Sequence, residues 1–461
     1  MPKKRVTTME KACLAGSAYL TFFCISIISS ALMKYFTDYV LLPAVMFGTA
    51  HLFFGVWTAL CNIVVGGLSD NIRSKVGKGK RLTFIRRSIP VMVIGYLLWM
   101  VADPDASNAL NTTFLVLGFA AMGVGATMFG INHASLVLNI TDDIDERTSI
   151  NIWNAVLVLV PGVITGSVPA YFFMEGYSFD FVRLLLSGAG IFMVAISWFC
   201  ASQLCEPEGV VEQSDGNTPQ TISGILKGFG ASLVSVFQSK SFVVYAIYNF
   251  LFAMVASVYF SNATYYLGNV LMVTGAMAGA VAIAGPVLEY AFYPIVRKLR
   301  NSAGTHKTMC LGLMVLSLSY LVMYFTEGYW PFIILYSAFH IGLAANWLLS
   351  LIMLGEIIEE DHLLTGRKRS GLFFGINGVL VVPAGSLMIF LFSVIIDYTG
   401  YDPQASQLTE LAEQGIRMGG MLLPAVISAA AFVVLYFFFP LKGDYYKDVR
   451  RRYHEQYGRK I

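Results

Sequence analysis

Twelve apolar runs, each long enough to cross a bilayer, most strongly constrain how this chain of 461 residues folds. A helix needs about 20 apolar residues to span the hydrocarbon core. The first six runs lie at about 12–37, 43–68, 83–101, 111–137, 150–173 and 181–203, and the second six at about 241–268, 273–296, 308–326, 329–354, 371–397 and 415–440. Only 13% of the residues are charged, against about 25% in soluble domains. The sequence therefore predicts an all-α membrane protein with twelve transmembrane helices.

The distribution of Lys and Arg predicts an orientation for these helices. Between the second and third runs, Gly66–Arg81 reads GGLSDNIRSKVGKGKR and carries six charged residues in sixteen, so it cannot lie in hydrocarbon. Loops on the cytoplasmic side of a membrane are enriched in Lys and Arg. If both termini are cytoplasmic, 28 of the 31 Lys and Arg residues fall inside. We therefore expect a multi-pass protein of the cell membrane with both termini in the cytoplasm.

Composition divides the chain into four parts. We expect an N-terminal six-helix bundle at 1–205 and a C-terminal one at 241–440. Between them, 206–240 has the composition of a cytoplasmic linker, in which 221–238 places apolar residues at the spacing of a helix on the membrane surface. The last part, 441–461, is a basic cytoplasmic tail.

The two halves repeat each other. A shift of 227 residues superimposes basic residues and a glycine of the loop after the second run on those after the eighth. The pairs are Arg73 with Arg300, Gly77 with Gly304, and Lys80 with Lys307. The charged stretch Asp142–Arg147 after the fourth run has a counterpart after the tenth, Glu356–Arg369. Similar loops at matching places in two halves are typical of a duplicated transporter fold.

These motifs together resemble one family. SDNIRSKVGKGKR, DDIDERTS and EEDHLLTGRKRSGLFFG are similar to loops of the glycoside–pentoside–hexuronide:cation symporters, within the major facilitator superfamily. The resemblance implies two six-helix bundles around a central cavity and a sugar or related solute coupled to a cation. It also implies a charge network that closes the cytoplasmic gate, formed by Asp70, Arg73, Asp143, Arg147, Glu360, Asp361 and Arg369.

The chain departs from this family at the expected binding positions. The two carboxylates that the family uses for its cation fall on Thr58 and Asn62, which offer oxygen but no charge. Its acidic sugar ligands fall on Phe22 and Gly130. The tryptophan of the tenth span is retained as Trp347, and an indole face can stack on a sugar ring.

Glu289 is the candidate for cation coupling from the residues alone. It lies inside the eighth run, and an ionisable residue at membrane depth is a functional candidate because its burial is costly. The 227-residue shift places it opposite Asn62. Burial disfavours a charged carboxylate, which suits a proton carrier, so we expect H⁺ rather than Na⁺ as the coupling ion. The alternatives are that Glu289 forms a structural hydrogen bond to a neighbouring helix or extends toward the cytoplasmic surface, and that sodium binds at Thr58 and Asn62.

Polar residues within the spans are candidates for binding the solute. Asparagine and histidine suit hydroxyl-bearing solutes, although a lone histidine is more often a packing residue. The candidates, with Trp347, are Asn154, Asn346, Asn377 and His340. Lys34 and Asp38 have i,i+4 spacing at the end of the first run and are expected to form a structural pair.

Other functional classes lack support in the sequence. It contains no nucleotide-binding loop, metal-ligand spacing or nucleophile–base constellation, so we expect no enzyme, no cofactor and no nucleic-acid partner. The favoured function is a cation-coupled symporter of a sugar, glycoside or similar small polar solute, acting as a monomer. Two alternatives stay open: a carrier of lysolipids or other amphiphiles, and a non-transporting receptor or scaffold built on a transporter fold.

Overall fold

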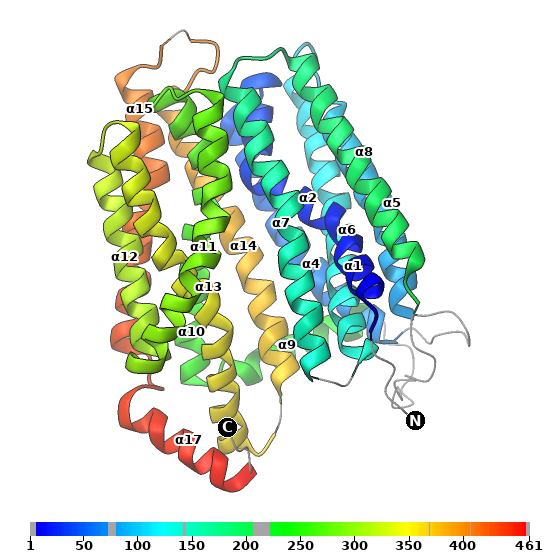
Figure 1. Cartoon of the computed structure of the whole chain (residues 1–461), viewed down its shortest axis with the longest axis vertical. Helices are drawn as coiled ribbons and strands as arrows, with labels where there is room; N and C mark the ends of the chain where they lie inside the picture. Colours follow the sequence, from blue (N-terminus) through cyan, green and yellow to red (C-terminus); the bar gives the residue numbers. More distant parts are fainter. Residues whose placement is uncertain are drawn as a thin grey trace.

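A computed structural model describes residues 6–71, 80–141, 144–205, 222–367, 369–405 and 407–457, which are almost entirely helical (Figure 1). The elements of the first half are α1 (Thr8–Ser17), α2 (Tyr19–Ser30), α3 (Leu32–Lys34), the π-helical turn η1 (Tyr35–Tyr39), α4 (Ala44–Asn71), α5 (Lys80–Met100), α6 (Asn108–Ile140), α7 (Ile144–Met174) and α8 (Phe179–Gln203).

The second half begins with a short helix, α9, in the linker. Its elements are α9 (Ile222–Val236), α10 (Lys240–Tyr265), η2 (Tyr266–Val270), α11 (Gly275–Ala303), α12 (Thr305–Phe325), α13 (Tyr329–Thr365), α14 (Ser370–Tyr398), α15 (Glu410–Arg417), η3 (Met418–Leu422), α16 (Leu423–Val433), η4 (Val434–Phe438) and α17 (Gly443–Tyr457).

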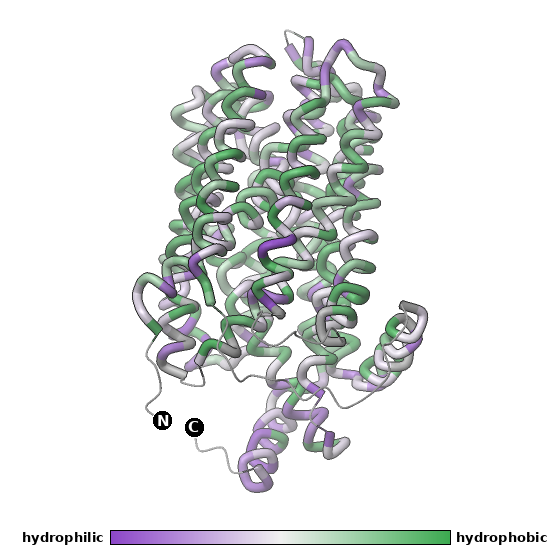
Figure 2. The backbone as a smooth tube through the Cα atoms, turned by 90° about the vertical axis from the view of Figure 1, so that its right-hand side faces the viewer, coloured by the Kyte–Doolittle hydropathy of each residue, from purple (hydrophilic) through white to green (hydrophobic). Residues whose placement is uncertain are grey.

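Within the part of the chain that the structure describes, twelve helices or helix series are long and apolar enough to cross a membrane, which confirms the predicted number of spans. Figure 2 shows the apolar residues concentrated along the bundle and the hydrophilic ones gathered mainly at its ends. Hydroxyl side chains at the first residue before a helix bond to its free backbone N–H groups and define where several spans begin. These caps are Ser107, Ser178, Ser239, Thr274 and Thr409.

Both chain termini lie at the same end of the bundle, which we call the terminal end; the opposite end is the distal end (Figure 1). The helix α17 packs across the terminal end of α13. Tyr445 donates a hydrogen bond to Glu360 (2.9 Å) and Tyr446 donates one to Glu356 (3.1 Å). Val449 of α17 is buried in the same contact.

Besides the contacts between α2 and α10, the two halves meet along two seams near the distal end. In the first, α4 and α14 approach closely: Gly48 lies against Ser393, and Gly55 against Ser386, so that a Cβ at either glycine would clash. In the second, between α7 and α11, the backbone N–H of Gly275 donates to the Glu175 carboxylate (2.8 Å).

Both seams open toward the terminal end. Gly375 lies on the same face of α14 as Ser386, three helical turns closer to the terminal end. Among the described residues, a Cβ at Gly375 would meet no atom within 4 Å, and the same holds at Gly162 of α7. The structure is therefore closed at the distal end, and its inter-half surfaces separate toward the terminal end.

Candidate functional site

A cleft of about 730 Å³ opens at the terminal end of the second half, between α11 and α13. Tyr290, Tyr293 and Arg297 line it from α11, and Leu348 and Ile352 line it from α13. The walls combine aromatic rings and aliphatic side chains with a basic rim. A solute-sized volume of this kind suits a ligand with both polar and apolar surface.

Glu289 lies next to this cleft. Its carboxylate accepts a hydrogen bond from the cleft-lining Tyr293, one helical turn closer to the terminal end (3.1 Å). The side chain is partly buried, and among the described residues it has no ion-pair partner. Glu289 does not itself line the cleft and is connected to it through Tyr293.

Glu289 also continues the seam between α7 and α11. On α11 that seam runs through Gly275, Gly279 and Ala282, and Ala282 contacts Gly166 of α7. Glu289 lies two helical turns beyond Ala282 toward the terminal end. On α7, one turn beyond Gly166 in the same direction, a Cβ at Gly162 would meet no atom of the described residues within 4 Å. The carboxylate therefore lies where this seam opens.

Asn62 has the equivalent place on the other seam. It follows Gly48 and Gly55 at seven-residue intervals along α4, and its Oδ1 accepts a hydrogen bond from Thr127 of α6 (3.1 Å). Thr58 is buried against α6 near Gly123, and its Oγ1 has no hydrogen-bond partner among the described residues. Asn62 and Glu289, which the sequence repeat pairs, thus follow their seams at the same seven-residue spacing along α4 and α11.

Trp347 and Asn377 are the predicted solute ligands that remain accessible. The Trp347 side chain is 42% exposed and packs edge-to-face on Phe252 of α10, with ring centroids 5.5 Å apart. Asn377 is partly buried, and its Oδ1 accepts a hydrogen bond from Asn249 Nδ2 (2.7 Å). Asn249 in turn accepts one from Ser350 (3.3 Å).

Asn346 and His340 lie inside the second half, with their polar atoms occupied. Asn346 is fully buried, accepts a hydrogen bond from Tyr248 (2.9 Å) and donates one to the backbone oxygen of Gly342 (2.9 Å). His340 is buried between Tyr336 and Tyr259: Nδ1 bonds the Tyr336 backbone oxygen (2.8 Å) and Nε2 lies 3.2 Å from the Tyr259 hydroxyl. Neither is available to a solute in this conformation.

Asn154, the candidate from the first half, lies on the terminal half of α7. It is partly buried, and its Oδ1 has no hydrogen-bond partner among the described residues. The oxygen atom itself is buried, so a solute could reach it only after the side chains around it move.

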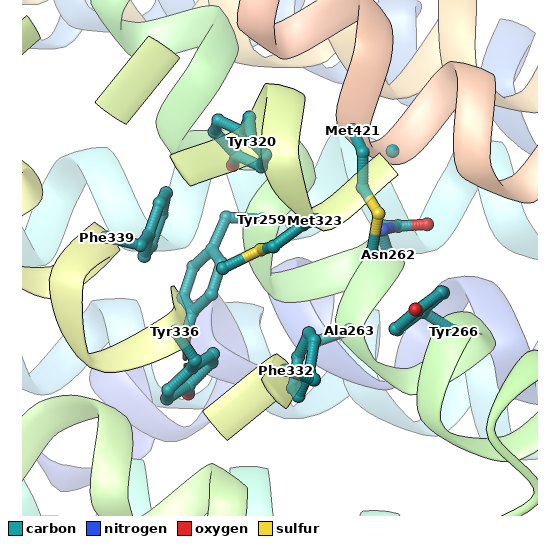
Figure 3. A pocket seen from close by; sticks show the side chains of 11 residues that line it. Tyr259, Asn262, Ala263, Tyr266, Tyr320, Met323, Phe332, Tyr336, Phe339 and Met421 are labelled. Atoms are coloured by element: carbon teal, nitrogen blue, oxygen red, sulfur yellow. Dashed lines mark hydrogen bonds between the residues drawn. The ribbon is translucent and has the colours of Figure 1, made fainter. Parts of the chain in front are cut away.

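A second cavity lies within the second half, among residues of α10, η2, α12, α13 and η3 (Figure 3). Its lining includes Tyr259, Asn262, Tyr320 and Tyr336, and its volume is only about 20 Å³. That is room for roughly one water molecule. It is too small for the solute.

Three of the predicted gate residues are described by the structure. Asp361 and Arg369 form an ion pair within the second half, and Arg369 also bonds Ser235 of α9. Glu360 accepts its hydrogen bond from α17. The side chains of the other four lie outside the described residues: Asp70, Arg73, Asp143 and Arg147.

The helix α9 contacts both halves at the terminal end. Ile225 packs on Gly67 of α4, and Ser235 bonds Arg369 next to α14. The apolar spacing of this segment predicts a helix on the membrane surface, but it does not identify these contacts with the two halves.

Sequence reasoning missed the polar chain that supports Asn377. Tyr245, Asn249 and Ser350 come from α10 and α13, and Tyr245 bonds Ser350 (2.9 Å). The signal was a run of polar residues on one face of α10, since Tyr245 and Asn249 are four residues apart.

Comparisons with known proteins agree with this architecture. A family model described as MFS/sugar transport protein matches residues 14–443. A Bacillus subtilis protein named as the uncharacterized symporter YjmB is 24% identical, and the alignment covers 98% of this chain and 97% of the relative. An Escherichia coli protein named as a glucuronide carrier protein homolog is 20% identical over 91% of this chain and 89% of its own length.

The fold is also shared with solved transporters. The structure of the nucleoside transporter NupG superimposes with a TM-score of 0.64 at 13% identity, covering 94% of this chain and 100% of that one. The protein is thus a multi-pass secondary transporter of small molecules and not an enzyme. As its loop motifs predicted, the chain belongs to the MFS/sugar transport protein family, among relatives consistent with the glycoside–pentoside–hexuronide:cation symporters.

Proposed function

We propose that this protein is a symporter that moves a sugar, glycoside or similar small polar solute together with a proton. The observation that carries the proposal is the placement of Glu289 where the seam between the halves opens, next to the cleft and hydrogen-bonded to Tyr293. A driven transporter needs a group whose ion occupancy changes the balance between its two open states. A carboxylate at the surface where the two halves move apart meets that requirement.

The chemistry of the solute is inferred from the accessible side chains and from the relatives. Trp347 offers an exposed aromatic face, and Asn377 offers an amide group for hydroxyls. The oxygen of Asn154 is buried in this conformation, so we propose it as an acceptor only after the surrounding side chains move. The names of the two relatives, a symporter and a glucuronide carrier homolog, favour a sugar-like solute. We leave Asn346 and His340 out of the binding site because their polar atoms are used within the bundle.

Because cytoplasmic loops are enriched in Lys and Arg, we assign the terminal end to the cytoplasmic side of a cell membrane. The structure then represents an inward-open state. In the outward-open state, we propose that Arg369, Asp361 and Glu360 approach the charged loops of the first half and close the inner side. The boundaries 1–205, 206–240, 241–440 and 441–461 describe the corresponding working parts, and we propose that a monomer suffices.

Solute-dependent proton uptake tests the proposal. The purified protein is reconstituted in vesicles that contain a pH-sensitive dye. Candidates come from a thermal-shift screen of sugars, glycosides and lysolipids. Addition of a stabilising sugar or glycoside should acidify the lumen. Stabilisation by lysolipids alone would favour an amphiphile carrier, and binding without any movement of solute would favour a receptor.

A further inference from the structure

The distal ends of the first and seventh spans share an unusual backbone. Each ends in a π-helical turn, Tyr35–Tyr39 in one half and Tyr266–Val270 in the other. Each turn is followed by a non-glycine residue with positive φ, Leu41 (60°) and Met272 (48°). Within the described residues these are the only two of that kind. Such backbone is strained, and π turns are frequent at functional sites.

The two turns superimpose when the sequence is shifted by 231 residues, and each then carries a polar side chain at the same position. Asp38 and Asn269 are 231 residues apart, the same spacing that separates Leu41 from Met272. In space they are joined by a third residue. The hydroxyl of Tyr401, in the loop after α14, donates to the carboxylate of Asp38 (2.9 Å to Oδ1) and accepts from Asn269 Nδ2 (2.9 Å).

A buried ion pair completes this cluster. Lys34 Nζ lies 2.5 Å from Asp38 Oδ2 and donates to Asn269 Oδ1 (3.5 Å). The lysine also lies over the ring of Tyr265, 4.9 Å from its centroid. The Lys34 side chain is 4% exposed and that of Asp38 is 14% exposed. A buried ion pair of this kind is stable only when further hydrogen bonds satisfy it.

The further hydrogen bonds come from the opposite half. Lys34 and Asp38 belong to the first half, whereas Asn269, Tyr401 and Tyr265 belong to the second. Burial, together with the charge of Asp38, raises the pKa of the Tyr401 phenol well above its ordinary value, so this group remains a donor. Separation of the halves at the distal end must therefore break the contacts of Asp38 with Tyr401 and of Lys34 with Asn269.

We propose that Lys34, Asp38, Asn269 and Tyr401 form a latch that closes the distal side of the transporter. The ion pair Lys34–Asp38 stays within the first half, and Asn269 and Tyr401 release it when the distal side opens. The two π turns are where the spans bend during that release. This extends the expected structural pair Lys34–Asp38 to a gate, and it rests on alternating access but not on the identity of the solute or ion.

A cysteine reporter beneath the latch tests this. Thr264 is suited to it, since it is 8% exposed and its hydroxyl donates to the Ser30 backbone oxygen of the other half (3.2 Å). In a Thr264→Cys background, an impermeant maleimide added from the distal side labels Cys at position 264. The further substitution Tyr401→Phe should raise the labelling rate about tenfold, because it removes one hydrogen bond to a charged group. Tyr398→Phe is the matched control because that side chain is 88% exposed. The parent with Thr264 measures the background from native cysteines.

A distance measurement keeps the result independent of the reporter. Spin labels at Asp105 and Gln404, both exposed in distal loops of opposite halves, should show a longer component in Tyr401→Phe and in Asn269→Ala. Unchanged labelling and unchanged distances in both variants, relative to Tyr398→Phe, would overturn the latch. Neither readout requires a solute or a proton gradient, so failure here is distinct from failure of the proposed symport.

Discussion

Asp361 and Arg369 form a bidentate ion pair at the terminal ends of α13 and α14. Arg369 Nε donates to Asp361 Oδ2 (3.0 Å), and its NH2 group donates to Oδ1. The Asp361 side chain is only 5% exposed. The pair lies within one half, so it stabilises the fold in this conformation, whatever it contacts when the terminal side closes.

Arg369→Gln should therefore lower stability by on the order of 3 kcal/mol, because it leaves a buried carboxylate without its partner. Thermal unfolding of the purified protein measures the effect. Arg367→Gln is the control, since Arg367 is exposed. Equal losses in the two variants would show that the ion pair contributes nothing specific.

The helix α17 should detach when its buried face becomes charged. Val449 is 4% exposed against the rest of the protein, so Val449→Asp would bury a carboxylate in an apolar contact. We expect faster proteolysis after Lys442 in Val449→Asp than in the parent. Lys447→Asp provides the control because the Lys447 side chain is 76% exposed. No change in cleavage for Val449→Asp would mean that the tyrosine–glutamate bonds alone hold the helix.

The spans could be predicted because length and apolarity alone define a membrane helix. The direction in which they cross stays a prediction from the charged loops. Which face of each helix is accessible to a solute could not be predicted from the sequence. Asn346 and Trp347 are neighbours in sequence, yet one is fully buried and the other is 42% exposed. The latch was beyond reach for a different reason: Tyr401 meets Asp38 across 363 residues, and π turns have no sequence signature.

Trp347→Ala should weaken binding of the stabilising sugar or glycoside by up to about tenfold, because an aromatic contact contributes ~0.5–1.5 kcal/mol beyond its buried area. Titration of the purified protein measures the dissociation constant. Trp330→Ala serves as the control, as Trp330 is 73% exposed near the start of α13. If both variants bind as the parent does, the indole is not part of the site.

Single cysteines at Ser214 and Gln404 should react with an impermeant reagent from opposite sides of the membrane. Ser214 lies in the linker outside the described residues, and Gln404 is exposed in a distal loop. The expectation follows from the excess of Lys and Arg at the terminal end. Reaction of both from the same side would disprove the assigned topology.

Glu289→Gln should abolish accumulation of solute against its gradient and leave solute binding and exchange intact. Glutamine keeps the shape of the side chain and an oxygen that can accept the hydrogen bond from Tyr293, but it cannot carry a proton. Without proton exchange, position 289 is occupied by a proton to no different extent in the two open states, so a proton gradient can no longer drive transport. Glu327→Gln is the matched control, because Glu327 is exposed in the loop before α13. Uptake into vesicles with and without a pH gradient, and solute exchange at equal pH, give the two readouts. If Glu289→Gln still accumulates solute, or if the parent requires sodium and ignores pH, the proton assignment fails and Thr58 and Asn62 become the coupling ligands to examine.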